Sequence, residues 1–464
     1  MDPYLLGAVA VGALVRLALM FHINTVPASD ALDYFTLASN LADGVGYEEF
    51  GRPTAFWPVG YPALLGLVFE IIGNEVWVAK ALNLVLALAA IPLLYLLGVV
   101  LYGRAVARPA SWLLALLPSH VFFTNLLIPE ALFTTLQLAV VLLVVAALRD
   151  GSRRSQAAPA GQGKALLGGF FLVPALGESE ESLGLACAAL IAGLAAWLAR
   201  TQRNLLFWLA AGTLVGYGLL VRPAALALAL AVLATLCVAA RQQKVAIGAP
   251  AALFIVSAGL VIAPWIVRNW TDIGAGATLA TNGGYNLMVG NNAGANGCAT
   301  FPIGASRYNK ENPNEVRADR EAFGDAVSFM ADNPDRAIAL VPLRLGCLWR
   351  DDDTAAAKWH FRKQPDGLGK LERDLWGAVS NWYYLGLLGL AGLGIPAWFR
   401  RTPEHLLPVI LVAVTTLVYL PFFGGDRFHQ SLLPYVALWA AVGIATVPRW
   451  LRISRSRDLE GEGL

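Results

Sequence analysis

The chain has 464 residues, of which 57% are hydrophobic and 14% are charged, and its mean hydropathy is +0.59. These values exclude an ordinary soluble domain and indicate a polytopic membrane protein. The net charge of +2 is not informative about partners, and neither a basic stripe nor zinc-finger spacing supports nucleic-acid binding.

The first apolar stretch covers residues 5–21 and contains Arg16. It lacks a basic leader and a cleavage motif, so we expect a retained membrane span and not a removed signal peptide. An arginine within a span either extends to the interface or pairs with a carboxylate, and we expect the first of these for Arg16.

The polar stretch that follows, residues 29–62, concentrates carboxylates directly outside this span. Asp30, Asp33, Tyr34 and Leu37 recur at helical spacing, which predicts a short helix with these four side chains on one face. Ser29 would cap this helix. Because charge near a bilayer is costly, the carboxylates indicate chemistry at the membrane surface. The apolar residues 61–72 are too few to cross a bilayer and are expected to lie along its interface.

Further apolar stretches predict the other spans. They cover residues 76–101, 111–127, 131–148, 205–220, 224–239, 245–266, 376–398, 406–422 and 432–447. Between residues 165 and 199 two shorter stretches leave either two crossings or none, and we expect two. Basic residues cluster in the short loops of one side, which places these loops and the C-terminus in the cytoplasm. The sequence thus predicts an all-α polytopic membrane protein with a bundle of about 10–12 membrane helices and with external interfacial helices and loops.

We expect three regions along the chain. Residues 1–267 form an N-terminal transmembrane region that includes a first external loop at 25–75. Residues 268–374 form a long external loop region, and a loop of this length is usually functional. Residues 375–464 hold the last membrane helices and a short cytoplasmic tail.

The four cysteines are too scattered for a disulfide framework, and none belongs to a CxxC pair. Cys298 and Cys347 both fall in the long external region. A single disulfide between them and two free thiols are both compatible with the sequence, and we favour the free thiols.

Unusual polar motifs gather on the external side of this arrangement. They contain Asp30, Asp33, Glu130, Arg222, Arg268, Asp426, Arg427 and His429. Any one of them has a simpler explanation, since an arginine at a helix end is often an interfacial anchor and an acidic residue often begins a helix. Together they provide carboxylates for proton transfer and guanidinium groups for a phosphate. Tyr34, Trp57 and Tyr61 would suit sugar stacking, although aromatic residues at an interface are usually anchors.

Eight short motifs occur in a specific order along nearly the whole chain. They are D-x-x-x-Y (Asp30, Tyr34), L-A-D-G-x-G-Y (41–47), P-x-G-Y-P (58–62), P-E-A-L-F (129–133), V-R-P (221–223), P-W-x-x-R-N (264–269), T-N-G-G-Y-N-L (281–287) and R-F-H-x-x-x-L-P (427–434). This set resembles the bacterial GT-C glycosyltransferases, in the protein-mannosyltransferase-like group that includes the aminoarabinose transferases of lipid A.

The resemblance implies an inverting integral membrane glycosyltransferase, either a hexosyl- or a pentosyltransferase. Its donor would be a sugar linked to a polyprenyl phosphate, and its acceptor a hydroxyl or phosphate of a glycolipid, polysaccharide or protein. The active site would face the periplasm or the extracytoplasmic side of the inner membrane. The product would serve the cell envelope, as in lipopolysaccharide or glycolipid biosynthesis.

The resemblance also implies roles for single residues. Many relatives carry Asp-Glu in the first external loop. The match places Asp30 on the Asp and Ala31 on the Glu, which leaves Asp33 as a substitute partner. Glu130 matches the second acidic position of the family. The basic residue of the aminoarabinose enzymes falls near Arg52 or Trp57.

The chemistry of sugar transfer favours residues of the same set for these roles. An acceptor hydroxyl must lose its proton as it attacks the anomeric carbon, and we assign this general-base role to Asp30. Arg222, Arg268 or Arg427 would stabilise the leaving phosphate without a metal. We expect no cofactor, although the carboxylates could hold a divalent cation.

Two other classes of protein remain open. A lipid-linked sugar flippase or transporter would line a path at the bilayer midplane with polar residues, whereas here polar residues crowd outside the spans. A membrane scaffold without catalysis would tolerate replacement of Asp30.

Overall fold

The structure is a computed structural model that describes residues 2–24, 26–157, 180–201, 205–243, 246–274, 276, 278–354 and 369–446. Within these ranges the chain is almost entirely helical. The one sheet is a two-stranded antiparallel hairpin of β1 (Glu48–Glu49) and β2 (Arg52–Pro53). The predicted all-α polytopic membrane protein is confirmed.

The helices of the described residues differ widely in length. They are α1 (Pro3–His22), α2 (Asp30–Ala42), α3 (Gly60–Ile72), α4 (Val76–Tyr102), α5 (Arg104–Ala115), α6 (Pro118–Phe123), α7 (Glu130–Ala157), α8 (Glu180–Thr201), α9 (Leu206–Val221), α10 (Leu226–Gln243), α11 (Gly248–Asp272), α12 (Gly283–Gly290), α13 (Glu315–Asp332), α14 (Pro334–Trp349), α15 (Lys370–Leu393), α16 (Ile395–Trp398), α17 (Pro403–Tyr419) and α18 (Asp426–His429). Short 3-10 helices are η2 (Pro223–Ala225), η3 (Ala305–Tyr308) and η5 (Gln430–Leu432), and residues 433–446 continue as a helix.

Six of the described helical stretches are long and apolar enough to cross a membrane. They are Pro3–His22, Val76–Tyr102, Glu130–Asp150, Pro223–Gln243, Gly248–Asp272 and Asp426–Thr446. Four shorter apolar helices are Gly60–Ile72, Leu183–Ala196, Leu206–Val221 and Pro403–Tyr419. Each of these ten stretches coincides with an apolar segment of the sequence.

Two predicted spans are divided in the structure. The span predicted at 111–127 is replaced by α5 and α6, which are separated at Leu116 and Leu117. Pro118 explains this break, because proline restricts the residue before it and cannot donate a backbone hydrogen bond. The span predicted at 376–398 ends early, since α15 stops at Leu393 and Pro396 follows in α16.

Of the two crossings predicted between residues 165 and 199, the first stretch, 165–176, lies outside the described residues. The second stretch, 183–198, lies within α8.

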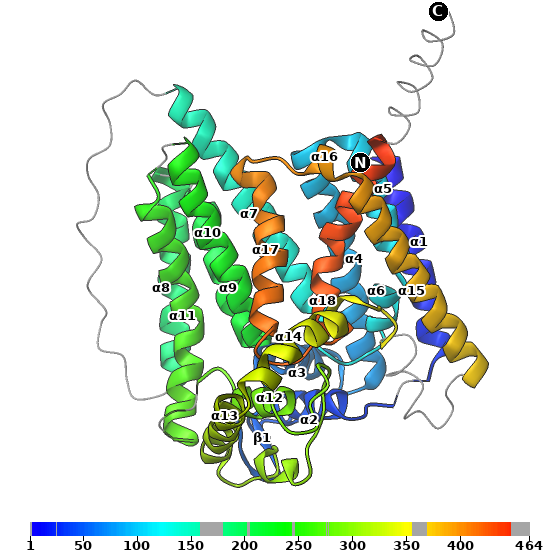
Figure 1. The fold of residues 1–464 in the computed structure, drawn as a ribbon. Coiled ribbons are helices and arrows are strands. Elements are labelled where there is room, and N and C mark those ends of the chain that lie inside the picture. Colours follow the sequence, from blue (N-terminus) through cyan, green and yellow to red (C-terminus); the bar gives the residue numbers. More distant parts are fainter. Residues whose placement is uncertain are drawn as a thin grey trace, which may run out of the picture.

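The long helices lie side by side, and the short elements gather at one end of the bundle, at the bottom of Figure 1. This end holds α2, α3, the hairpin and helices α12, α13 and α14, whereas the N-terminus and α16 lie at the opposite end. The described part of the predicted external loop region contains α12, η3, α13 and α14, between the end of α11 and the start of α15. It packs next to the first external loop, so residues far apart in sequence meet there.

Helices α9 and α11 show how the bundle is held together. Gly212 and Gly216 lie one turn apart on α9, and a Cβ on either would clash with α11: it would lie 2.1 Å from Ser257 Oγ at Gly212 and 2.6 Å from the carbonyl oxygen of Ala258 at Gly216. Small residues at this spacing let helix backbones approach closely within a membrane.

Arg16 is not placed as predicted. It neither extends to the interface nor pairs with a carboxylate, but is fully buried between α1, α5 and α6. Its guanidinium donates hydrogen bonds to the carbonyl oxygens of Gly12 (3.0 Å) and Ala115 (2.8 Å) and contacts His120 Nδ1 at 2.8 Å. The carbonyl of Ala115 is exposed by the break between α5 and α6, so Arg16 satisfies a backbone group that the helices leave open.

We predict that Arg16→Leu destabilises the protein by about 2 kcal/mol, because it leaves the Ala115 carbonyl and His120 without their partner. The measurement is thermal unfolding of the purified protein in detergent, with the exposed Arg104→Ala as the control. Equal unfolding temperatures for Arg16→Leu and the wild type would contradict this role.

Candidate functional site

Helix α2 begins at Asp30, the residue that we expect to act as the general base. Ser29 occupies the N-cap position as predicted, but its hydroxyl makes no capping bond and instead donates to Asp30 Oδ1 at 3.3 Å. Asp33, Tyr34 and Leu37 are buried on the face that the spacing predicts. Ser29 has φ 55° and, with Phe50 in the hairpin, is one of two non-glycine residues with positive φ among those described. Unfavourable backbone conformations of this kind cluster at functional sites.

Four side chains from different parts of the chain form what we call the central ion cluster: Asp30, Glu130, Arg222 and Arg427. Arg427 Nη1 donates to Asp30 Oδ2 at 2.7 Å, and its Nε donates to Glu130 Oε1. Arg222 Nη1 donates to the same Glu130 oxygen at 3.1 Å. The fork of Arg427 thus joins the start of α2 to the start of α7, and Arg222 adds the end of α9.

Exposure separates the two carboxylates of the central ion cluster. The side chain of Glu130 is 1% exposed, whereas that of Asp30 is 22% exposed. Glu130 is therefore enclosed between two guanidinium groups, and Asp30 is the more accessible carboxylate of the cluster. The rings of Phe133 and Phe428 lie 5.7 and 5.6 Å from the Arg222 guanidinium and cover it.

A second group, the outer ion cluster, consists of Asp33, Glu49 and Lys310. Lys310 Nζ donates to Asp33 Oδ1 and, at 2.9 Å, to Glu49 Oε1. Burial raises the pKa of Asp33 and of Glu49, and the lysine opposes both shifts. Burial also lowers the pKa of Lys310, but the bonds to the two carboxylates outweigh this effect and the pKa is raised overall.

The sequence did not predict the role of Lys310. It lies in a polar run without motif or periodicity, 277 residues from Asp33. Only the packing of the external region against the first external loop brings these residues together.

Arg268, predicted to bind phosphate, contacts the backbone of the first external loop. Its Nη1 donates to the carbonyl oxygen of Thr54 at 2.7 Å and its Nη2 to that of Tyr47 at 3.0 Å, and it pairs with Asp272 at 3.0 Å. The structure therefore gives Arg268 a role in holding this loop, next to but separate from the central ion cluster.

Tyr34, Trp57 and Tyr61 pack together. The ring centroid of Tyr34 lies 5.2 Å from that of Trp57 and 5.6 Å from that of Tyr61. Tyr61 is fully buried and donates to Asn83 Oδ1 at 3.2 Å, whereas Trp57 is partly accessible. Of these three rings, Trp57 is therefore the most accessible. Arg52 lies elsewhere, in the hairpin, and donates to the carbonyl oxygen of Lys310 at 3.0 Å.

His429, also predicted to bind substrate, is buried in the core. Its ring stacks between Trp349 and Tyr384, with centroids 5.4 and 5.1 Å away. Its Nδ1 contacts the carbonyl oxygen of Leu348, and its Nε2 lies 3.4 Å from Asp352 Oδ1. With partners on both nitrogens, His429 anchors the helix that carries Arg427.

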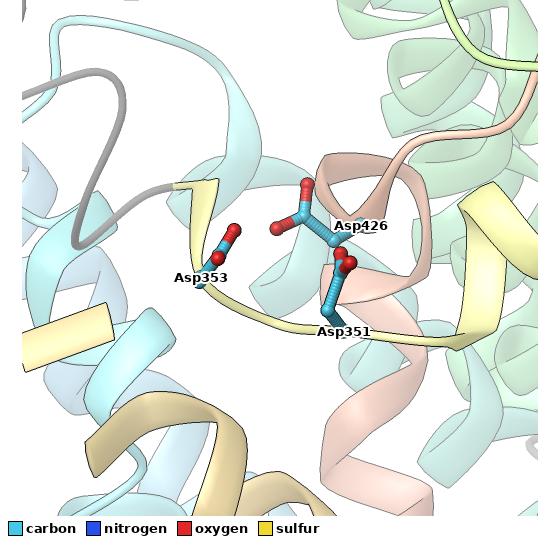
Figure 2. Close-up of side chains that lie close together, drawn as sticks. All are labelled: Asp351, Asp353 and Asp426. Carbon is cyan, nitrogen blue, oxygen red and sulfur yellow. The ribbon is translucent and has the colours of Figure 1, made fainter. Parts of the chain in front are cut away.

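Asp351, Asp353 and Asp426 come together beside this helix, as Figure 2 shows. One oxygen of each carboxylate lies within 4.8 Å of the others, an arrangement that suits a hard divalent cation. Both oxygens of Asp426 already accept backbone hydrogen bonds, from Thr354 at 2.6 Å and Arg427 at 2.9 Å. No motif of the sequence indicates that these three residues lie together.

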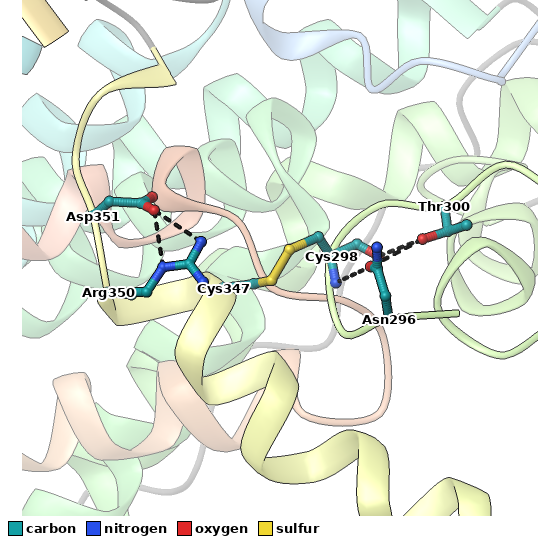
Figure 3. Close-up of a disulfide and its surroundings, with 6 residues drawn as sticks. All are labelled: Asn296, Cys298, Thr300, Cys347, Arg350 and Asp351. Atoms are coloured by element: carbon teal, nitrogen blue, oxygen red, sulfur yellow. Dashed lines mark hydrogen bonds and ion pairs between the residues drawn. A yellow bond between two sulfur atoms is a disulfide. The ribbon is translucent and has the colours of Figure 1, made fainter. Parts of the chain in front are cut away.

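Cys298 and Cys347 form a disulfide, which corrects the expectation of free thiols (Figure 3). Their Cα atoms are 5.5 Å apart, a normal separation for a disulfide. The bond joins the loop after α12 to the end of α14. The sequence could not decide this pairing because 49 residues separate the two cysteines. Cys187 and Cys237 are free.

The disulfide lies against the loop that leads to Arg427. Gly424 donates its N–H to the carbonyl oxygen of Gly297 at 2.8 Å and pairs with Cys298 in an isolated β-bridge. A Cβ on Gly424 would lie 2.7 Å from Cys347 Cβ and 2.2 Å from the Arg344 carbonyl oxygen, so only glycine fits. The disulfide therefore supports the segment that positions Arg427.

The sequence matches no family model and no curated protein. Solved structures do match. The oligosaccharyltransferase AglB of Archaeoglobus fulgidus, in complex with an inhibitory peptide and a dolichol-phosphate, is 12% identical, with a TM-score of 0.50 over 99% of this chain and 52% of that chain. In its apo form the same enzyme is 13% identical, with a TM-score of 0.54 over 98% of this chain and 52% of that chain.

The ArnT protein of Cupriavidus metallidurans, bound to undecaprenyl phosphate, is 13% identical, with a TM-score of 0.40 over 95% of this chain and 77% of that chain. The present chain spans about half the length of the oligosaccharyltransferase it matches. Over nearly its whole length the chain shares the fold of this oligosaccharyltransferase.

We predict that peptide mapping under non-reducing conditions finds the Cys298–Cys347 pair. Replacing both cysteines by serine should cost about 2–4 kcal/mol of stability, since the bond closes a long loop. Thermal unfolding of Cys298→Ser/Cys347→Ser tests this, with Cys187→Ser/Cys237→Ser as the control. Equal losses in both double variants would show that the disulfide adds no stability of its own.

Proposed function

We propose that the protein transfers a sugar from a polyprenyl-phosphate-linked donor to a glycolipid, polysaccharide or protein acceptor at the outer face of the inner membrane. The observation that carries this proposal is the central ion cluster, in which one accessible carboxylate lies beside two guanidinium groups. The GT-C fold supports it, and so does the dolichol-phosphate bound by the oligosaccharyltransferase.

Asp30 acts as the general base in this proposal. It is the most exposed carboxylate of the two ion clusters, at 22%, compared with 9% for Asp33, 9% for Glu49 and 1% for Glu130. Its Oδ2 is held by Arg427, which orients the carboxylate, and a proton of the acceptor hydroxyl passes to Asp30 as the oxygen attacks the anomeric carbon.

Arg427 and Arg222 bind the lipid phosphate that leaves. Both are already directed at carboxylates in the central ion cluster, so their charge is positioned before the donor arrives. Glu130 fixes their spacing by accepting from both. Arg268 holds the first external loop under this assignment, and no metal is required.

The test is to incubate the purified protein with labelled polyprenyl-phosphate sugars and a membrane glycolipid extract. Transfer of label to an acceptor establishes the reaction class and begins to define the sugar. Saturable binding of a lipid-linked sugar without transfer from any donor would contradict the proposal and favour a flippase.

We predict that Asp30→Asn lowers the rate of transfer at least about 100-fold, because the amide cannot accept the proton. Asp33→Asn should have a smaller effect, since Asp33 is less accessible and paired with Lys310. The rates are compared with that of Asp43→Asn, an exposed carboxylate at the other end of α2. Equal and mild losses in Asp30→Asn and Asp33→Asn would exclude Asp30 as the base.

We also predict that Arg427→Lys lowers kcat/KM at least about tenfold, because an ammonium group cannot reproduce the fork that binds Asp30 and Glu130 together. Arg350→Lys, at an exposed arginine that pairs with Asp351, is the matched control. Activity of Arg427→Lys close to that of the wild type would show that the fork is dispensable.

A further inference from the structure

Lys310 connects two parts of the molecule that are distant in sequence. It lies between η3 and α13, and its ammonium group contacts Asp33 on α2 and Glu49 on β1. All three side chains are largely enclosed, at 20% exposed for the lysine and 9% for each carboxylate. The outer ion cluster is therefore not an ordinary surface salt bridge, which would be solvated and weak.

Further contacts fix the segment around Lys310 against the first external loop. Glu315, at the start of α13, accepts hydrogen bonds from Thr54 Oγ1 at 2.8 Å and from the backbone N–H of Ala55 at 2.6 Å. The N–H of Thr281 donates to the carbonyl oxygen of Ala55 at 2.9 Å. Thr281, Lys310 and Glu315 thus attach the external region to the first external loop.

The charges around Asp33 explain why a cation is needed there. Asp30 lies three residues earlier on α2, Glu49 approaches from the hairpin, and Glu315 lies near Glu49 from α13. The cations include Lys310, which both Asp33 and Glu49 share, and Arg427, which is engaged by Asp30 and Glu130. Arg52 lies opposite Glu49 in the hairpin and donates to the carbonyl oxygen of Lys310. Without Lys310, Asp33 and Glu49 would lose the ammonium group that they share.

We propose that Lys310 is a positioning residue of the transfer site, which binds Asp33 beside Asp30 and, together with Glu315, holds the external region against the first external loop. The proposal rests on the transfer reaction proposed above and adds to it a residue from the external region. Lys310 acts through Asp33 and does not touch the reacting atoms.

Loss of Lys310 changes the pKa of Asp33 in a definite direction. Burial and the charge of Asp30 raise the pKa of Asp33, and Lys310 lowers it. When this cation is removed, the pKa of Asp33 rises, so Asp33 takes up a proton at higher pH than in the wild type. The proposed site works best with Asp33 ionised, so the acidic limb of the rate profile moves to higher pH.

The experiment is the pH profile of kcat/KM for the wild type, Lys310→Met, Lys310→Arg and Glu49→Gln. Lys310→Met should move the acidic limb of the profile to higher pH by about one unit. At a pH below the limb, kcat/KM then falls about tenfold, and at a pH above the limb it falls much less. Lys310→Arg should restore the wild-type limb because it keeps the charge. Glu49→Gln removes the second carboxylate that binds Lys310. The lysine still pairs with Asp33, so the acidic limb should not move to higher pH.

Arg307→Met is the matched control, since Arg307 lies in the same segment but is exposed and pairs with Asp325. A loss in Lys310→Met that is equal at every pH, or no rescue by arginine, would overturn the proposal and leave Lys310 with a packing role only.

A second measurement does not depend on activity. Amine labelling followed by mass spectrometry should show Lys310 protected in the wild type and labelled faster in Asp33→Asn. Protection of Lys310 without transfer from any donor would refute the transfer reaction but not the ion pair. Transfer with an unchanged limb in Lys310→Met would refute the inference alone, and so would equal labelling in the wild type and Asp33→Asn.

Discussion

The shared hydrogen bonding of two arginines to Glu130 is the constraint on which the candidate site depends. Glu130 is enclosed at the start of α7, where an unpaired carboxylate would be costly, so Arg222 and Arg427 must both approach it. In doing so they bring together the ends of α7, α9 and α18. The remaining donor of Arg427 reaches Asp30, which fixes the start of α2 against the bundle.

Further contacts stabilise the segments next to the central ion cluster. The disulfide and the close approach at Gly424 support the segment before Arg427. Arg268 holds the backbone of the first external loop, and Lys310 and Glu315 join that loop to the external region. Helix α2 and strand β1, which supply carboxylates to the two ion clusters, lie at the end of the bundle where the short helices gather (Figure 1).

Much of the fold could be predicted from the sequence, because apolar length predicts membrane helices and i, i+3, i+4 spacing predicts the buried face of α2. The motifs also predicted the members of the central ion cluster. Contacts that depend on tertiary packing could not be predicted: those of Arg16 with Ala115 and His120, the pairing of Cys298 with Cys347, and Lys310 at Asp33. In each case 49 or more residues separate the partners, and no periodicity relates them.

In the proposed reaction, the guanidinium groups of the central ion cluster receive a lipid phosphate beside an accessible carboxylate. The most direct measurement is a cryo-electron microscopy structure of the protein with a polyprenyl phosphate. We expect the phosphate within hydrogen-bonding distance of Arg427 or Arg222 and next to Asp30. A phosphate bound along the middle of the bundle, with both arginines still paired only to carboxylates, would contradict the account and favour a transport path.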